Sequence, residues 1–213
     1  MKILLTNFHE GDGGGHTTYL MALARGLCGR HEIHVAAPPA SRLYREASTV
    51  EGIRAVAQPF PNGLGKLAES LRARRQLRAY LHQHAFDIVH VNGSADHRLV
   101  LAALRGAENA PCIVLTKHNS KPIAGLGHRW RAKRTHLVIA VSDYTRRMLE
   151  TSAYAGLPIV TVRNGVDTGY FHPWSTDAQA TERARHAEDA TLLLGSNAGT
   201  ADHKGWMDLI EAV

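Results

Sequence analysis

Short apolar runs alternate with longer amphipathic stretches along most of the chain. The runs are continuous in Val, Ile, Leu and Ala rather than alternating with polar residues, which is typical of parallel strands that are buried on both faces. The predicted strands are residues 2–6, 33–37, 53–57, 88–91, 112–117, 137–141 and 159–162. The predicted helices are residues 17–28, 64–84, 98–104, 126–134 and 144–152. We therefore expect an α/β fold with a doubly wound, parallel, Rossmann-like sheet, whose ligands gather outside the carboxyl ends of the strands.

This alternation stops at residue 164. Asn-Gly and His-Pro turn signals and a charged segment fill residues 164–190, which we interpret as an interdomain linker. A new strand is predicted at 191–196 and a helix at 203–213, which would begin a second domain. The first domain is then 1–163. Because the last helix reaches Val213 without a capping residue, we expect the native chain to continue.

A glycine-rich loop follows the first strand, where residues 10–18 read EGDGGGHTT. Glycines let backbone N–H groups approach a ligand, and the helix that follows presents unpaired donors to an anion. The alternative is a tight turn without a ligand. A nicotinamide dinucleotide site is disfavoured because His16 replaces the third glycine of the fingerprint and no carboxylate ends the second strand. A P-loop is excluded because no Gly-Lys-Ser/Thr follows.

The charge balance adds a preference for anionic partners. The 213 residues include 25 Lys and Arg against 19 Asp and Glu, which gives a net charge of +6. Nucleotide phosphates, lipid-linked phosphates and anionic membranes all fit this charge. Nucleic acid is disfavoured because few aromatic residues interleave with the basic ones and no nucleic-acid-binding motif is present. Cys28 and Cys112 lie in apolar segments and are expected to be buried free thiols of a reducing compartment.

The predicted helix 64–84 is basic and amphipathic. Its leucines recur at helical spacing, and four arginines lie on or beside the same stripe: Arg72, Arg74, Arg75 and Arg78. Such a helix can lie on anionic lipid, and a second basic cluster, Arg129, Arg131, Lys133 and Arg134, would assist. The alternative is a solvated helix with snorkelling arginines. Since the opening residues are too short for a signal peptide and no run is long enough to span a bilayer, we expect a cytoplasmic protein, peripheral on the inner face of the membrane.

Several segments, in order along the chain, resemble the retaining glycosyltransferases of family 4 (glycosyl transferase group 1), which have the GT-B fold. The matching segments are GGGH at 13–16, LA..L at 23–27 with HEIHV at 31–35, FDIVHVN at 86–92, TKHN at 116–119, AVS at 140–142, VRNGVD at 162–167 with FHP at 171–173, and LG at 194–195 with KGW..LI.A at 204–212. The resemblance implies the N-terminal, acceptor-side domain of such an enzyme and, at 191–213, the truncated start of its C-terminal, nucleotide-sugar-binding domain.

The resemblance also implies the roles of individual residues. His118 is similar to the histidine that contacts the transferred sugar and is the catalytic candidate; a satisfied histidine at a strand end is the alternative. The residues expected to bind donor or acceptor are Gly13, Gly14, Gly15, His16, Asn119, Asn164 and Lys204. The chain departs from the family pattern at Ser196, where the family has an arginine, and the family's paired donor-binding glutamates would lie beyond Val213.

The implied function is a hexosyltransferase that moves a sugar from a nucleotide-sugar donor to a saccharide or lipid-linked acceptor in cell-surface polysaccharide or lipopolysaccharide synthesis. Residues 1–213 alone are expected to be inactive. The nucleotide-diphosphate sugar is a substrate, no cofactor is expected, and the histidines show no metal-ligand spacing. The alternative is a non-catalytic acceptor-binding or membrane-docking module that partners a separate catalytic chain. The unpaired strand edge that such a module would expose disfavours it.

Overall fold

The computed structural model describes residues 1–119, 121, 123–187, 191–195 and 204–213. The chain divides into two compact units, Met1–Gly165 and Val166–Val213. Each unit is described by itself below.

The first unit is built on a parallel sheet. Its strands are β1 (Lys2–Thr6), β2 (Glu32–Ala37), β3 (Ile53–Ala57), β4 (Ile88–Val91), β5 (Cys112–Lys117), β6 (Leu137–Ala140) and β7 (Ile159–Thr161). Within the described part of the chain they form a seven-stranded sheet in the order β3-β2-β1-β4-β5-β6-β7, in which every neighbouring pair is parallel. This confirms the predicted doubly wound, Rossmann-like fold.

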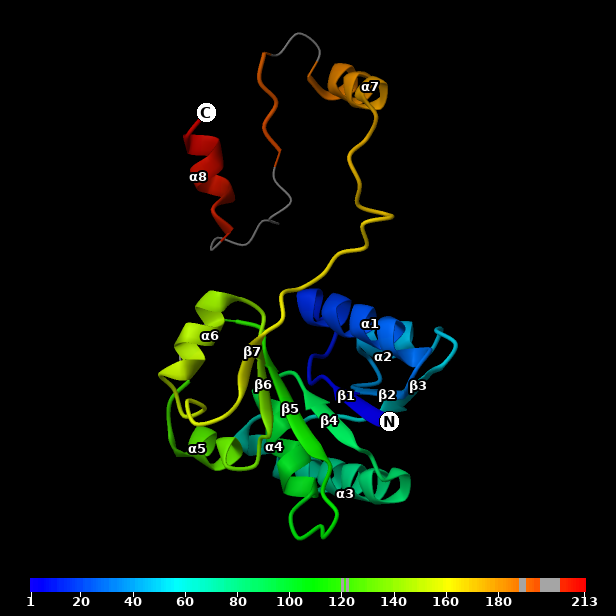
Figure 1. The fold of residues 1–213 in the computed structure, drawn as a ribbon, viewed down its shortest axis with the longest axis vertical. Helices are drawn as coiled ribbons and strands as arrows, with labels where there is room; N and C mark the ends of the chain where they lie inside the picture. The colour runs from blue at the N-terminus through cyan, green and yellow to red at the C-terminus, as the bar shows by residue number, and fades with distance from the viewer. Residues whose placement is uncertain (120, 122, 188–190, 196–203) are drawn as a thin grey trace. The chain divides into compact units, whose positions relative to one another are not determined.

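Helices cover both faces of the sheet. They are α1 (Gly14–Cys28), α2 (Arg42–Ala47), α3 (Leu67–His84) after the short turn η1 (Leu64–Lys66), α4 (Ser94–Ala103), α5 (Leu126–Ala132) and α6 (Asp143–Glu150). Figure 1 shows α1 and α2 on one side of the sheet and α3 and α4 on the other. The short helix α2 was not predicted, because its six residues are too few to show a helical period.

The alternation of side chains along β1 explains this layering. Ile3 and Leu5 belong to the apolar cluster that packs against α1 and α2, whereas Leu4 belongs to the cluster under α3 and α4. Successive side chains of a strand point to opposite faces, so a strand with helices on both sides must be apolar at every position. The continuous apolar runs of the sequence therefore reflect two cores that share one sheet.

Leu67 and Leu71 on α3 are 68% and 44% exposed, and the core side of α3 consists of Ala73, Leu77 and Leu81. The expectation that both cysteines are buried is wrong. Cys112 is exposed and Cys28 is half-buried, although both are free thiols. Cys112 is the first residue of β5, where the strand has just emerged from a loop. Among the residues that the structure describes, no helix is long and apolar enough to cross a bilayer.

The second unit contains α7 (Thr176–Ala187) and α8 (Trp206–Glu211), and neither helix has a buried residue. The segment predicted as a linker therefore includes a helix. Residues 191–195 form no strand, although a strand was predicted from 191 to 196. A strand needs a neighbour to complete its ladder of hydrogen bonds, and none is paired with this segment among the described residues. Ser196, the last residue of the predicted strand, and His203, the first residue of the predicted helix, lie outside the described residues.

Candidate functional site

The loops that follow β1, β4 and β5 meet at one edge of the sheet. The register places Leu5 of β1 beside His90 of β4, and Val91 of β4 beside Leu115 of β5. Because parallel strands end at the same edge, the residues just after these strands are brought together there. They include His9, Asn92 and His118.

The glycine loop adopts backbone angles that need glycine. Gly13 has φ +68°, and a Cβ at this position would lie 2.5 Å from the Thr17 hydroxyl oxygen. Gly14 is also left-handed, with φ +48° and open space around it. Both are strained conformations for other residues. The loop is attached to α2, because the backbone N–H of Arg42 donates to the carbonyl of Gly11 at 2.7 Å.

The amino terminus of α1 has no side-chain cap. The helix begins at Gly14 with Gly13 in the capping position, so Thr17 lies within the helix and does not cap its amino terminus. The Thr17 hydroxyl donates instead to the carbonyl of Asp12 at 2.9 Å. The first N–H groups of α1 therefore have no side-chain acceptor, which is the arrangement that helix termini use to bind anions.

His118 is held by an amide. Its Nε2 lies 2.9 Å from Oδ1 of Asn92, whose Nδ2 donates to the carbonyls of Thr6 and His90. Because the Asn92 nitrogen already donates, its oxygen must accept, and His118 Nε2 must carry the hydrogen. The other ring nitrogen, Nδ1, then has a lone pair that can accept a hydrogen bond from a hydroxyl of a substrate.

The His118 ring lies in an aromatic cluster. The ring centroids of His16 and His118 are 4.1 Å apart, His16 lies 4.5 Å from His9, and Tyr19 lies edge-on to His118 at 4.7 Å. Burial, with a smaller contribution from neighbouring His16, lowers the pKa of His118 to about 3. Burial, with His9, also lowers the pKa of His16 to about 4. These imidazoles are therefore neutral at physiological pH, so they act as hydrogen-bonding groups rather than cations.

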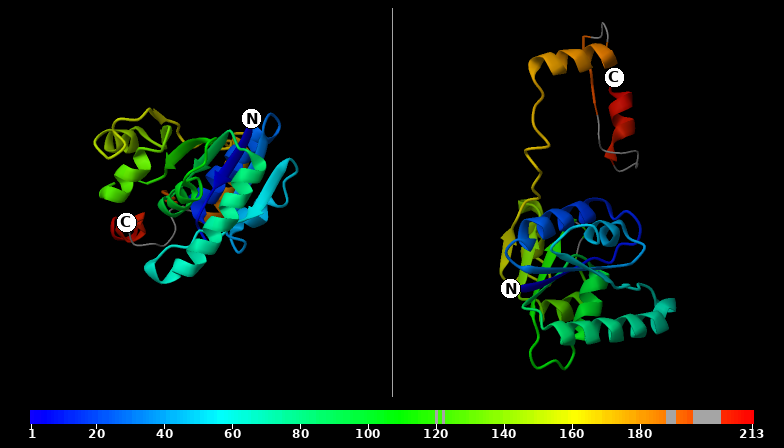
Figure 2. Two further views of the ribbon diagram at one scale, coloured as in Figure 1. Left: turned by 90° about the horizontal axis from the view of Figure 1, so that it is seen from below. Right: turned by 90° about the vertical axis from the view of Figure 1, so that its right-hand side faces the viewer.

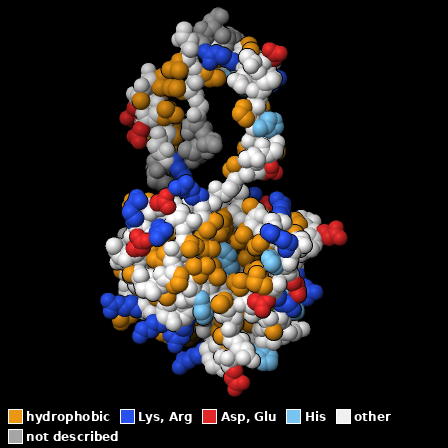
Figure 3. All heavy atoms as spheres, in the orientation of Figure 1, with side chains coloured by type: hydrophobic (Ala, Val, Ile, Leu, Met, Phe, Trp, Pro, Cys, Tyr) orange, Lys and Arg blue, Asp and Glu red, His pale blue; other side chains and the backbone are white. Residues whose placement is uncertain are grey.

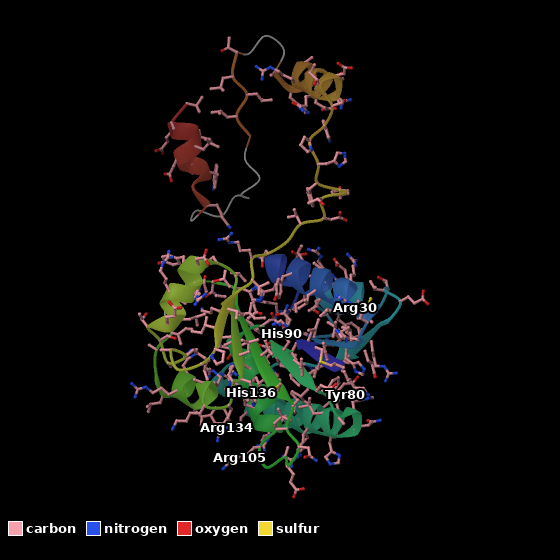
Figure 4. The ribbon with its side chains drawn as sticks, in the orientation of Figure 1. Arg30, Tyr80, His90, Arg105, Arg134 and His136 are labelled. Carbon is pink, nitrogen blue, oxygen red and sulfur yellow. The ribbon has the colours of Figure 1, made fainter. Side chains whose placement is uncertain are left out.

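A buried polar network supports Asn92 from behind. The Asp96 carboxyl accepts hydrogen bonds from the Thr6 hydroxyl at 2.8 Å and from the Asn92 backbone N–H at 2.7 Å. Burial raises the pKa of Asp96 to about 7 against the opposing effect of these hydrogen bonds. His90, labelled within the sheet in Figure 4, lies 2.6 Å from the Thr116 hydroxyl, which also contacts the Tyr19 hydroxyl at 3.2 Å. The network fixes the backbone at Asn92, whose side chain holds His118.

A pocket of 390 Å³ opens beside these residues. Its lining includes Gly13, His16 and His118 of the predicted site. It also includes residues that the sequence did not assign to the site: His97, Lys117, Lys121, His128, Arg131 and Tyr154. They come from α4, the end of β5 and the loop after it, α5, and the turn after α6, so nothing in their sequence spacing indicates that they meet.

The structure brings together only part of the predicted set. Asn119 lines the pocket, and its Oδ1 accepts from the Lys117 ammonium and the Lys121 backbone N–H. Gly14 and Gly15 lie in the first turn of α1, next to the lining residues Gly13 and His16. Asn164 is exposed after β7 and is not among the lining residues, and Lys204 is exposed in the second unit. Among the described residues, no group of His, Cys, Asp and Glu side chains is arranged to hold a metal ion.

The second basic cluster does not form one surface. Arg131 is only 8% exposed and lines the pocket, which contradicts its assignment to a membrane-facing group. Arg134 lies over the Trp130 ring at 4.6 Å, near the lower border of the first unit in Figure 4. On the face seen in Figure 3, Lys and Arg side chains lie mostly around the border of this unit, and hydrophobic and His side chains lie nearer its centre.

Comparison with known proteins agrees with this architecture. Residues 13–170 match the profile of Glycosyltransferase Family 4. The chain belongs to glycosyltransferase family 4. The matched segment includes Gly13 to His16 of the glycine loop, Asn92 and His118, so most of the site just described lies inside the family domain.

Individual relatives of this family 4 chain are about twice as long. It is 28% identical over 166 residues to the phosphatidyl-myo-inositol mannosyltransferase of Mycolicibacterium smegmatis, a match that covers 74% of the chain and 42% of the relative. A glycosyltransferase from Rickettsia africae has a TM-score of 0.74 at 19% identity, covering 99% of the chain and 56% of that structure. Anabaena Alr3699/HepE, solved with UDP and glucose, has a TM-score of 0.71 at 19% identity, covering 100% of the chain and 57% of that structure.

Proposed function

We propose that this chain is the acceptor-side part of a glycosyltransferase that moves a hexose from a nucleotide-diphosphate sugar to a saccharide or lipid-linked acceptor. The observation that carries the proposal is the hydrogen bond that holds His118 in one tautomer at the edge of the pocket. A neutral imidazole with a free lone pair on Nδ1 can accept a hydrogen bond from a sugar hydroxyl and orient the sugar for transfer.

The glycine loop supports the donor half of the proposal. Transfer releases a nucleoside diphosphate, whose negative charge must be stabilised as the bond to the sugar breaks. The uncapped amino terminus of α1 supplies N–H groups beside His16 for such a charge. Lys204, in the second unit, is proposed to neutralise phosphate charge, and Asn119 and Asn164 to contact donor or acceptor. Retention of configuration at the transferred sugar is part of the proposal and follows from the family resemblance.

The biological setting is proposed from the relatives. The mannosyltransferase relative is named for a lipid acceptor, phosphatidyl-myo-inositol. A lipid-linked acceptor fits synthesis of cell-surface polysaccharide or lipopolysaccharide, carried out by a cytoplasmic enzyme at the inner face of the membrane. Since the match covers 42% of that relative, we propose that activity requires the longer protein.

Helix α3 supports contact with a membrane. Leu67 and Leu71 expose apolar surface at its amino-terminal end, and Arg72 and Arg75 are exposed beside them. Figure 2 shows this helix along the border of the first unit. Exposed leucines next to arginines are the combination that binds the interface of anionic lipid. Arg78 is partly engaged within the protein, because its guanidinium donates to the carbonyls of Ala103 and Arg105.

The test is transfer of labelled sugar from a panel of nucleotide-diphosphate sugars by the full product of the native gene. Wild type, His118→Ala and a matched control, His82→Ala, would be compared; His82 is an exposed histidine on α3 outside the pocket. We expect a loss of about 100-fold or more in kcat for His118→Ala and no change for the control. A full-length product with no transfer to any acceptor, active only when a second chain is added, would favour the non-catalytic docking module.

A further inference from the structure

Arg131 is a buried cation without a partner anion. Its side chain is at the carboxyl-terminal end of α5, and the residue is only 8% exposed. Its Nε is fully buried and has no hydrogen-bond partner. Within the described ranges, no Asp or Glu forms an ion pair with it. Burying an unpaired guanidinium costs stability, so a position like this needs a reason other than folding.

The surroundings of Arg131 add positive charge instead of cancelling it. Lys117 and Lys121 line the same pocket, and no carboxylate is among its described lining residues. Arg131 helps to lower the pKa values of His97 and His128, after the larger effect of burial. The Tyr154 hydroxyl is close to the guanidinium and can share a ligand with it, because Tyr154 also lines the pocket.

The amino terminus of α4 faces the same space. Gly93 and Ser94 line the pocket, and α4 has no side-chain cap. The nearest acid is Asp96, which is next to Gly93. Its Oδ2 already accepts hydrogen bonds from the Thr6 hydroxyl and the Asn92 backbone N–H. The pocket therefore combines a buried guanidinium, two ammonium groups and a helix amino terminus. This is the set of donors that binds phosphate oxygens.

We propose that Arg131, with Lys117, Lys121 and the amino terminus of α4, forms a subsite for a phosphoryl group carried by the acceptor. The proposal rests on the proposed function and specifies its acceptor class: a phosphate ester of a polyol or of a lipid-linked saccharide. The guanidinium binds two phosphate oxygens of the acceptor, and His118, which lines the same pocket, contacts the sugar that is transferred. The nucleotide donor also carries phosphate, so the test separates the two sources.

The experiment measures thermal unfolding of residues 1–213 with ligands that carry phosphate and with a neutral control. The ligands are inorganic phosphate, glycerol 1-phosphate, UDP and neutral glycerol, each at an ionic strength matched with NaCl. Wild type is compared with Arg131→Met and with Arg129→Met, which removes an exposed arginine from the same helix. A ligand that binds only the folded state at a hundred-fold excess over Kd is expected to raise Tm by about 5 °C or more.

The expected result has three parts. Phosphate and glycerol 1-phosphate raise the Tm of wild type and Arg129→Met but not of Arg131→Met, while glycerol has no effect. Without ligand, Arg131→Met is as stable as wild type or more stable, because an unpaired buried charge is gone; a structural arginine would show a loss. Any effect of UDP is the same in all three proteins. These results would hold even if no sugar transfer were found, so the subsite and the proposed function fail separately.

Three results would overturn the proposal. The first is a phosphate effect that Arg131→Met retains in full. The second is a wild-type response no larger than that to NaCl. The third is a UDP effect that disappears in Arg131→Met without any response to glycerol 1-phosphate, which would assign the subsite to the donor. If Arg131→Met does not fold, imidazole resonances of the wild type decide: His97 and His128 must shift with phosphate while His82 does not.

Discussion

Nε2 of His118 and Oδ1 of Asn92 are 2.9 Å apart, and this contact joins the ends of two neighbouring strands, β4 and β5. The two residues are 26 positions apart in the chain. The amide of Asn92 has no freedom to turn, because its nitrogen is committed to the carbonyls of Thr6 and His90. Asn92 is therefore a positioning residue that sets the tautomer and the orientation of the His118 ring.

Replacing Asn92 is expected to impair turnover more than binding. In Asn92→Ala the His118 ring loses its acceptor and samples other orientations, so kcat should fall by up to about 100-fold while KM changes little. The measurement is steady-state transfer by the full-length protein, with Asn109→Ala, an exposed asparagine outside the pocket, as the control. Equal loss of both parameters, or a Tm too low for folding at the assay temperature, would indicate a structural role instead.

Stability is expected to fall in mild acid. The pKa values of buried His90 and His97 are lowered by burial to about 4 and about 3. Between pH 6.5 and these values the unfolded chain binds protons that the folded protein does not bind, so the free energy of unfolding decreases as the pH falls. Each such histidine contributes up to ~1.4 kcal/mol per pH unit. Calorimetry from pH 7 to pH 5 checks this; a flat Tm would contradict the neutral, buried state of these rings.

Asp96 is expected to act in the opposite direction. Because burial raises its pKa to about 7, the folded protein holds a proton that the unfolded chain releases, and this contribution to stability is lost as the pH rises through about 7. Asp96→Asn removes the titration, so the difference in Tm between variant and wild type should become more positive from pH 5 to pH 8, by several degrees. A difference that does not change with pH would show that Asp96 titrates normally.

The glycine loop offers a matched pair of variants. Gly13→Ala introduces a Cβ at φ +68° and 2.5 Å from the Thr17 hydroxyl, so it should cost ~1–3 kcal/mol in the free energy of unfolding. Gly15→Ala is in open space within α1 and should be neutral or stabilising by up to ~1 kcal/mol. Urea unfolding of both variants measures the difference. Equal effects of the two substitutions would mean that the backbone at Gly13 is not constrained as described.

Membrane contact through α3 is testable without activity. In flotation with vesicles containing anionic lipid, wild type should bind, and Arg72→Glu with Arg75→Glu should release it, because the pair of exposed cations at the apolar end becomes repulsive. Arg25→Glu with Arg45→Glu, at exposed positions on α1 and α2, makes the same change in net charge and is the control. Binding that is independent of anionic lipid, or equal loss in the control, would argue against α3 as the contact surface.

The seven strands of the sheet and their parallel arrangement could be predicted from the sequence alone. A strand covered by helices on both faces has to be apolar at every position, so runs such as the one containing Ile3, Leu4 and Leu5 are recognisable without a structure. The glycines before α1 and the histidine after β5 follow directly from the strand ends, because parallel strands bring their carboxyl ends to one edge.

Only the tertiary structure shows which side chains meet at this edge of the sheet. Lys133 and Arg134 follow Arg131 in a basic stretch that predicts a solvated or lipid-facing surface. The packing of α5 beside α4 instead buries Arg131 at the pocket. The partnership of Asn92 and His118 likewise depends on the pairing of β4 with β5. Local sequence sets helical and strand periodicity, but it carries no information about which faces of distant elements meet, because that is fixed only when the two cores pack around the sheet.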